Sequence, residues 1–159
     1  MMQHADVDQG RICRSQPFFF TAIIHTSPLE GEPEPMQATQ KFKVLIVEDD
    51  RWSRELMSEW VSLREELELQ GLAASALEAL DLMREKEASE GQGYDLILLD
   101  INLPGMSGLE FLEQVEELPF IIFTTAHEQF AVQAYEIGVL DYLLKPIEQA
   151  RFDRAIDRF

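Results

Sequence analysis

The sequence is poor in cysteine, in basic residues and in long apolar runs. Cys13 is the only cysteine, which excludes an internal disulfide and suits a reducing compartment, so we expect a cytoplasmic protein. The 13 Lys and Arg against 30 Asp and Glu give a net charge of −17, which repels nucleic-acid phosphates and anionic lipids. We therefore expect this segment to contact neither nucleic acid nor a membrane. The longest apolar stretch, residues 17–24, is far shorter than the roughly 20 residues that span a bilayer.

Residues 1–40 differ from the rest of the chain. They show neither sustained helical periodicity nor strand alternation, and residues 28–35 (PLEGEPEP) have a linker composition. A secretory signal around Arg11, Arg14 and the following apolar run is disfavoured, because acidic residues precede the bases and no small-residue cleavage site follows. Two interpretations stay open: a disordered extension, or a chain whose true start is Met36.

Residues 41–159 alternate between strand and helix patterns. Short runs that are apolar throughout indicate strands buried on both faces, and they predict strands at 42–47, 96–99, 120–123 and 142–144. Residues 67–73 predict a weaker strand that contains Gly71. Apolar residues at helical spacing predict helices at 51–63, from Ser75 onward, through 109–115, at 130–137 and at 147–159. The expected apolar faces of the first two helices are Trp52, Leu56, Trp60 and Leu63, and Ala76, Leu77, Leu80 and Met83. Ser75 and Glu78 have the spacing of a capping box.

Five strand–helix units with right-handed crossovers predict an α/β domain with a doubly wound parallel sheet over 41–159. In such folds, ligands bind at the carboxyl ends of the strands, so the residues that follow each strand are the candidates for chemistry. These strand-end residues are Glu48, Asp49 and Asp50, then Asp100 and Asn102, then Thr124 and Thr125, and finally Lys145.

Each strand-end residue also has a purely structural interpretation; Asp50, for example, can cap the next helix. Together they favour a phosphate-handling site. Converging carboxylates repel one another unless protons or a metal offset the charge, and an all-oxygen set suits Mg²⁺. No cluster of Cys and His competes for zinc, and His127 is expected on the surface. An aspartate there can attack phosphorus and become an acyl phosphate, with Lys145 offsetting the developing charge.

The chain resembles the receiver domain of two-component response regulators. The resemblance rests on residues 44–50 (VLIVEDD), 99–108 (LDINLPGMSG), Thr125 with Ala126, and 141–146 (DYLLKP), and it covers 41–159. It implies a (βα)5 flavodoxin-like fold with strand order 2-1-3-4-5. It also implies a sensor histidine kinase as partner, no enzymatic turnover beyond self-phosphorylation and self-dephosphorylation, and homodimer formation on phosphorylation.

The resemblance also implies a role for each matching residue. Asp100 would be the phosphoacceptor, and Lys145 would pair with the phosphoryl group, its bond to Pro146 being cis. Thr125 and Tyr142 would be the switch pair that repacks a dimerisation face. The implied Mg²⁺ ligands are Asp49, Asp100, the backbone carbonyl of Asn102, and Glu48 through a water. The residues expected on the dimerisation face are Phe130, Ala131, Tyr135 and Val139.

A finer resemblance is to receivers attached to LytTR-type DNA-binding domains, through residues 123–131, 134–146 and 151–155. No output domain follows Phe159, so we expect either a truncated transcription regulator or a stand-alone receiver. Two departures from the family stand out: residues 85–93 are expected to form an extra loop, and Ser107 replaces a more common acid or amide.

Three other functions fit the sequence less well. A Mg²⁺-dependent aspartyl-phosphate phosphatase usually has a second acid two residues after the aspartate, where this chain has Asn102. A flavodoxin-like FMN module needs Gly, Ser and Thr loops, whereas this edge is acidic. A degenerate receiver used only for protein contact is disfavoured by the presence of Asp100, Thr125 and Lys145.

Overall fold

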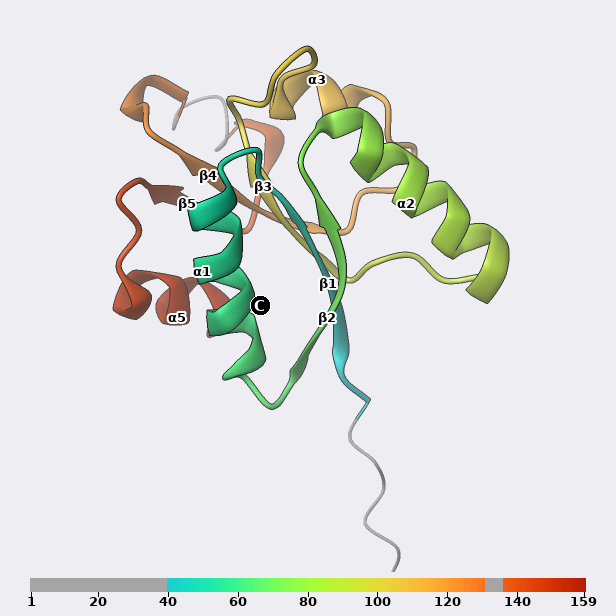
Figure 1. Ribbon diagram of the computed structural model, residues 1–159, viewed down its shortest axis with the longest axis horizontal. Helices are drawn as coiled ribbons and strands as arrows, with labels where there is room; N and C mark the ends of the chain where they lie inside the picture. The colour runs from blue at the N-terminus through green and yellow to red at the C-terminus, as the bar shows by residue number, and fades with distance from the viewer. Residues whose placement is uncertain (1–39, 131–135) are drawn as a thin grey trace, which may run out of the picture. The chain divides into compact units, whose positions relative to one another are not determined.

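The computed structural model describes residues 40–130 and 136–159, which form a five-stranded parallel sheet with helices on both faces (Figure 1). The strands are β1 (Phe42–Val47), β2 (Leu67–Ala73), β3 (Leu96–Asp100), β4 (Phe120–Thr125) and β5 (Asp141–Leu144). The helices are α1 (Arg51–Ser62), α2 (Ala76–Glu90), α3 (Gly108–Glu113) and α5 (Gln149–Ile156), with a 3₁₀ turn η1 (Glu128–Phe130). The strand order is β2-β1-β3-β4-β5, which confirms the predicted doubly wound fold.

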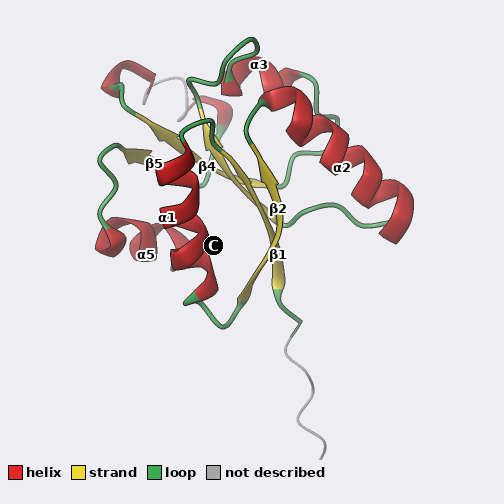
Figure 2. Cartoon of the chain, viewed as in Figure 1, coloured by secondary structure: helices red, strands yellow, loops and turns green. Residues whose placement is uncertain are grey.

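The sheet has a buried core on each face. Helices α1 and α5 cover one face, and α2 and α3 cover the other (Figures 1 and 2). Side chains of β1 and β3 alternate between the two cores, so that Leu45 and Ile97 pack toward α2 and α3 while Ile46 and Leu98 pack toward α1 and α5. All five residues of β3 are buried, as expected for a central strand whose sequence is apolar until its last residue.

The buried faces of α1 and α2 agree with the prediction only in part. In α1, Trp60 is buried as predicted, together with Met57 and Val61, whereas Trp52 is 78% exposed and Leu56 and Leu63 are also exposed. The predicted set and the observed set both have helical spacing, and the spacing alone does not say which stripe meets the sheet. In α2, Ala76 and Leu80 are buried as predicted, together with Ala79 and Lys86, and Met83 packs against the same core, whereas Leu77 is exposed.

Several element ends also differ from the prediction. Residues 85–90 continue α2 instead of forming an extra loop, and Lys86 there is buried, donating to Gln70 and Glu90. Helix α3 ends at Glu113 rather than at residue 115, and α5 is shorter than residues 147–159 at both ends. Ser75 caps α2 as predicted, accepting from the Glu78 N–H, but the Glu78 carboxylate accepts from the Ala74 N–H, so the capping box is incomplete.

The predicted helix at 130–137 is described only at its ends. Phe130 belongs to η1, Glu136 and Ile137 are helical, and the left-handed Gly138 (φ +80°) follows them. Residues 131–135, with Ala131 and Tyr135 of the expected dimerisation face, lie outside the described residues. So do residues 1–39, including Cys13 and the predicted extension. Within the described ranges, no helix is long and apolar enough to cross a membrane.

Candidate functional site

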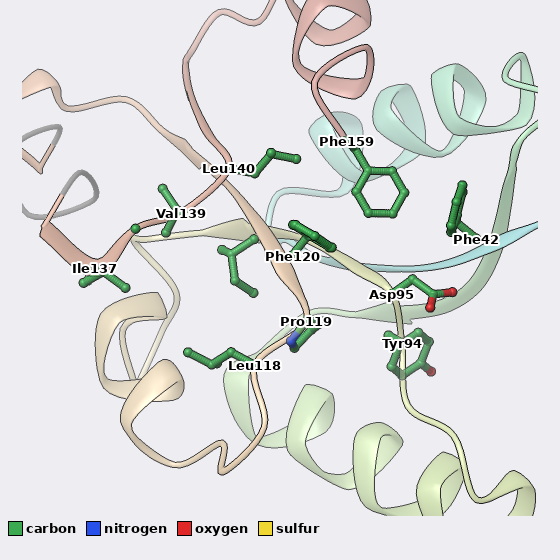
Figure 3. A pocket seen from close by; sticks show the side chains of 12 residues that line it. Phe42, Tyr94, Asp95, Leu118, Pro119, Phe120, Ile137, Val139, Leu140 and Phe159 are labelled. Carbon is green, nitrogen blue, oxygen red and sulfur yellow. The ribbon is translucent and has the colours of Figure 1, made fainter.

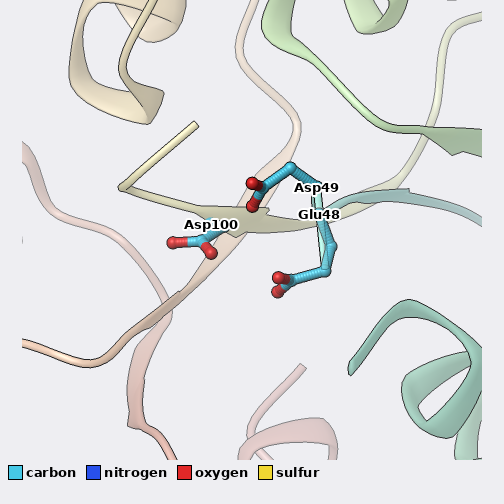
Figure 4. Close-up of side chains that lie close together, drawn as sticks. All are labelled: Glu48, Asp49 and Asp100. Carbon is cyan, nitrogen blue, oxygen red and sulfur yellow. The ribbon is translucent and has the colours of Figure 1, made fainter. Parts of the chain in front are cut away.

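The carboxyl ends of β1 and β3 bring three carboxylates together. Glu48 and Asp49 follow β1, Asp100 ends β3, and the two strands are parallel neighbours. One carboxylate oxygen from each residue lies within 4.8 Å of the other two, and Figure 4 shows the three side chains converging on a common space. Glu48 and Asp100 are buried, whereas Asp49 is exposed, so the cluster opens to solvent on one side.

Lys145, directly after β5, is the cation that balances this cluster. Its Nζ lies 2.6 Å from Asp100 Oδ2 and 2.7 Å from Glu48 Oε2. Its backbone N–H donates to the Thr125 carbonyl at 2.7 Å, and its peptide bond to Pro146 is cis, as the resemblance implied. Burial acts to lower the pKa of Lys145, but the bonds to Asp100 and Glu48 outweigh burial and raise it, so this amine stays charged.

One lysine does not neutralise three carboxylates. Burial raises the pKa of Glu48 from 4.5 to about 7, with the charge of Asp100 adding to the rise and the hydrogen bond from Lys145 opposing it. The free site therefore carries an excess of negative charge, and Glu48 takes up a proton near neutral pH. A bound cation relieves the same excess.

The acidic loop is fixed by the start of α1. Asp50 caps the helix by accepting from the Ser53 N–H at 2.8 Å, and the bonds from Ser53 lower the pKa of Asp50; this agrees with its structural interpretation. Arg54, one turn into α1, donates to the Glu48 carbonyl at 2.6 Å and to the Asp49 carbonyl at 3.3 Å. Sequence reasoning missed Arg54; the available signal was a basic residue one helical turn after an acidic pair.

The loop after Asp100 is held by backbone contacts. The Asn102 N–H donates to Asp100 Oδ1 at 2.8 Å, which fixes that carboxylate oxygen. Gly108 begins α3 so close to this loop that a Cβ there would lie 2.4 Å from the Asp100 carbonyl oxygen. Ser107 and Glu110 form a complete capping box at the same helix start, a role for Ser107 that the sequence analysis did not foresee.

The two predicted switch residues both hydrogen-bond to the backbone of His127. Thr125 is buried at the end of β4, and its Oγ1 accepts from the His127 N–H at 3.2 Å. The Tyr142 hydroxyl donates to the His127 carbonyl. Thr125 and Tyr142, 17 positions apart, are thus linked through one residue, whose own side chain is exposed as expected. The neighbouring Thr124 is buried and donates a long 3.5 Å bond to Glu48.

The donor set of the cluster fits a hard divalent cation. Glu48, Asp49 and Asp100 offer only carboxylate oxygens, one of them from a solvent-exposed residue. Mg²⁺ prefers oxygen ligands and keeps several waters, which the open side of the cluster leaves room for. Zinc usually needs Cys or His ligands, and this cluster has neither.

A hollow lies at the opposite end of the strands, where β1 and β4 begin (Figure 3). It has a volume of about 760 Å³ and is lined mainly by apolar side chains such as Phe42, Phe120 and Phe159. Of the described residues that line it, Asp95 is the one acid, and its carboxylate accepts from the Lys43 N–H. Nothing in this hollow resembles the charge arrangement at the carboxyl ends of the strands, so we assign the chemistry to the acidic cluster.

Comparison with known proteins agrees with the fold. The family model described as "Response regulator receiver domain" matches residues 44–157. An uncharacterized response regulatory protein of Vibrio cholerae is 34% identical over 116 residues, which are 72% of this chain and 46% of that protein. The transcriptional regulatory protein BtsR of Salmonella typhi is 36% identical over 118 residues, 73% of this chain and 47% of BtsR. The chain therefore spans about half the length of the curated relatives that it matches.

Solved structures give the same picture. The response regulatory domain of protein mrkE from Klebsiella pneumoniae has a TM-score of 0.64 and 30% sequence identity, covering 73% of this chain and 93% of that one. The bacteriophytochrome response regulator AtBRR has a TM-score of 0.60 and 28% identity, covering 75% and 92% of the two chains. The fold, the matched residues and these relatives lead to one conclusion: the chain belongs to the response regulator receiver domain family.

Proposed function

We propose that this receiver, spanning 41–159, accepts a phosphoryl group on Asp100 from a sensor histidine kinase and passes the signal on through Thr125 and Tyr142. One observation carries the proposal. The buried Asp100 carboxylate is held on one oxygen by Lys145 (2.6 Å) and on the other by the Asn102 N–H (2.8 Å), beside two further carboxylates.

The metal set that we propose is Asp49, Asp100 and the backbone carbonyl of Asn102, with Glu48 acting through a water. Mg²⁺ bound there would offset the negative charge that develops on the transferring phosphoryl group. The three clustered carboxylates and the raised pKa of Glu48 support this assignment, because both mark a site with more negative charge than Lys145 balances.

The proposed transfer is a displacement at phosphorus. An Asp100 carboxylate oxygen attacks the phosphorus of the kinase phosphohistidine, the P–N bond breaks, and its electron pair stays on the imidazole. The product is an acyl phosphate on Asp100 and a free kinase histidine. Lys145, whose ammonium already contacts Asp100, can follow the added charge and donate to a phosphoryl oxygen.

The switch follows from the hydrogen bonds around His127. The Thr125 hydroxyl accepts from the His127 N–H and so keeps its own proton free to donate to a phosphoryl oxygen. Movement of Thr125 toward the phosphoryl group pulls on the His127 backbone, to which Tyr142 is bonded. The Tyr142 ring then repacks. We propose that this change, near Phe130 and Val139, promotes homodimer formation.

We further infer that the receiver controls a LytTR-type DNA-binding output, so the kinase and the receiver would meet in the cytoplasm. Two facts support this: residues 123–131, 134–146 and 151–155 resemble receivers of that type, and the chain spans about half of relatives that include a transcriptional regulatory protein. A stand-alone receiver is the alternative. The mass of the native protein, measured in extracts of its own cells, distinguishes the two.

A signalling role fits the site better than phosphatase turnover. Position 102, two residues after Asp100, holds an exposed asparagine, which cannot shuttle the proton that an aspartyl-phosphate phosphatase needs there.

The test is the intact mass of the full chain after incubation with acetyl phosphate, with Mg²⁺ or with EDTA. Wild-type protein should gain one phosphate only with Mg²⁺. Asp100→Asn should gain none, and Asp81→Asn, which changes an exposed aspartate of α2, should behave like wild type. A phosphate adduct that persists in Asp100→Asn, or one that forms equally in EDTA, would contradict the proposal.

A further inference from the structure

We propose that Asp141 and Arg151 are positioning residues that clamp the backbone of Tyr142 to α5, so that the switch moves the Tyr142 side chain and leaves its backbone in place. The inference rests on the function proposed above, in which Tyr142 is the switch aromatic. It adds a part that the acidic site does not include.

The clamp is a bidentate ion pair between β5 and α5. Asp141, the first residue of β5, is buried, and Arg151 lies in the first turn of α5. Arg151 Nη1 lies 2.7 Å from Asp141 Oδ2, and Arg151 Nη2 lies 2.5 Å from Asp141 Oδ1. Two parallel bonds of this kind fix the orientation of both groups, which a single bond does not. Burial acts to raise the pKa of Asp141, but the bonds from Arg151 and the Tyr142 N–H outweigh it and lower that pKa.

The same two residues bind both backbone polar groups of Tyr142. The Tyr142 N–H donates to Asp141 Oδ1 at 2.8 Å, and Arg151 Nη2 donates to the Tyr142 carbonyl at 3.0 Å. Among the strands of the described residues, β5 is at the edge of the sheet, so its outward backbone groups have no further strand there to pair with. The clamp thus supplies the partners that a neighbouring strand would supply, at the residue whose side chain is the proposed switch.

The clamp and the Tyr142 side chain lie on opposite faces of β5. Arg151 belongs to α5, on the face where Leu143 packs, whereas the Tyr142 ring packs against the core on the α2 and α3 side. The Tyr142 hydroxyl reaches the His127 carbonyl on that side. The backbone is therefore fixed from one face while the ring is free to respond on the other. A loose backbone would let the whole residue shift and would weaken the link from Thr125.

The chain offers a matched control for Arg151. Arg158 also donates to Asp141, at 3.2 Å, but the Arg158 side chain is 62% exposed. Among the described residues, Asp141 is the one group to which the Arg158 side chain donates a hydrogen bond. Replacing Arg158 removes a positive charge beside Asp141 without touching Tyr142. Any effect specific to Arg151 then reflects its bidentate pair with Asp141 and its bond to the Tyr142 carbonyl.

The experiment is ¹⁹F NMR of the full chain labelled with 3-fluorotyrosine. The chain has three tyrosines, Tyr94, Tyr135 and Tyr142, so three resonances can be assigned by single Tyr→Phe variants. Spectra of wild type, Arg151→Met and Arg158→Met are recorded before and after incubation with acetyl phosphate and Mg²⁺. Intact mass gives the phosphorylation rate of each.

We expect Arg151→Met to shift or broaden the Tyr142 resonance, to leave the Tyr94 resonance in place, and to lose the phosphorylation-linked change of Tyr142. Its phosphorylation rate should stay within about twofold of wild type, because sites without shared partners act nearly independently. Arg158→Met should match wild type.

A Tyr142 resonance in Arg151→Met identical to that in Arg158→Met would overturn the clamp. If circular dichroism shows that Arg151→Met does not fold, Arg151→Lys is used instead, with the same expectations. Lysine keeps the positive charge but cannot form the two parallel bonds to Asp141.

The experiment can refute the clamp and the proposed function independently of each other. The spectra before phosphorylation test the clamp alone, because they need no phosphoryl transfer. A wild-type protein that never gains phosphate would refute the function while leaving the comparison of Arg151→Met with Arg158→Met intact.

Discussion

Neutralising Glu48 should change how the stability of the protein depends on pH. Glu48 is fully buried, and its pKa rises from 4.5 in the unfolded chain to about 7 in the folded, metal-free protein. Because the folded state holds the proton more tightly, protonated Glu48 stabilises the fold. This contribution is complete below pH 4.5 and is lost as the pH rises through 7. The Glu48→Gln variant has no proton to lose and should not show this loss.

The size of the effect follows from the two pKa values. Between pH 5.5 and pH 8, proton linkage with pKa values of 4.5 and about 7 removes about 2 kcal/mol from the unfolding free energy of wild type. The difference between wild type and Glu48→Gln should therefore change by about 2 kcal/mol over this interval, in favour of the variant at high pH. Glu48→Gln also loses the ion pair with Lys145. This loss changes the unfolding free energy of the variant by a similar amount at pH 5.5 and at pH 8, because Lys145 keeps Asp100 as a partner. The difference between the two pH values therefore remains.

The assay is urea unfolding in EDTA at both pH values, followed by circular dichroism. Glu113→Gln, an exposed change on α3, controls for the loss of one negative charge. Its stability difference from wild type should vary little between the two pH values. If the difference for Glu48→Gln is likewise the same at pH 5.5 and pH 8, Glu48 ionises in the folded protein as it does in the unfolded chain, and the account of an overcharged site is wrong.

Three more changes test the same site. Gly108→Ala should destabilise the fold by roughly 1–3 kcal/mol in urea unfolding, because its Cβ would lie 2.4 Å from the Asp100 carbonyl; an unchanged midpoint would show that α3 is free to move away. Lys145→Met should lower stability by about 3 kcal/mol at pH 8 in EDTA, since it leaves Glu48 and Asp100 without their shared cation, and added Mg²⁺ should restore part of the loss. Mg²⁺ at 100 times its Kd should raise the unfolding free energy of wild type by about 3 kcal/mol, and Asp49→Asn should abolish most of that gain; equal gains would remove Asp49 from the metal set.

The sequence was most informative where a residue's position in the fold follows from one strand. Runs such as residues 96–99 are apolar on both faces, which places them in the centre of a parallel sheet. Because ligands of such folds bind at the carboxyl ends of parallel strands, the sequence alone predicts that Glu48, Asp49, Asp100 and Lys145 lie at one site.

The sequence was less informative where two elements must be oriented against each other. Both the Trp52 stripe and the Met57 stripe of α1 have helical spacing, and the approach of the helix to the sheet selects the second. The bonds from Arg54 to the Glu48 and Asp49 carbonyls, and from Arg151 to Tyr142, join a side chain to a backbone group. The spacing of Arg54 after the acidic pair is a weak signal for the first, but a residue pattern does not identify which backbone group a side chain binds. The need for glycine at position 108 appears only once α3 is placed against the Asp100 loop.

The most direct test of the central claim is to locate the phosphoryl group. The full chain is phosphorylated with acetyl phosphate and Mg²⁺, reduced with borohydride, which converts an acyl phosphate to an alcohol, and then digested and sequenced by mass spectrometry. We predict that residue 100 alone carries homoserine in place of aspartate. Homoserine at position 49, or an unmodified residue 100 in protein whose intact mass shows one phosphate, would contradict the account.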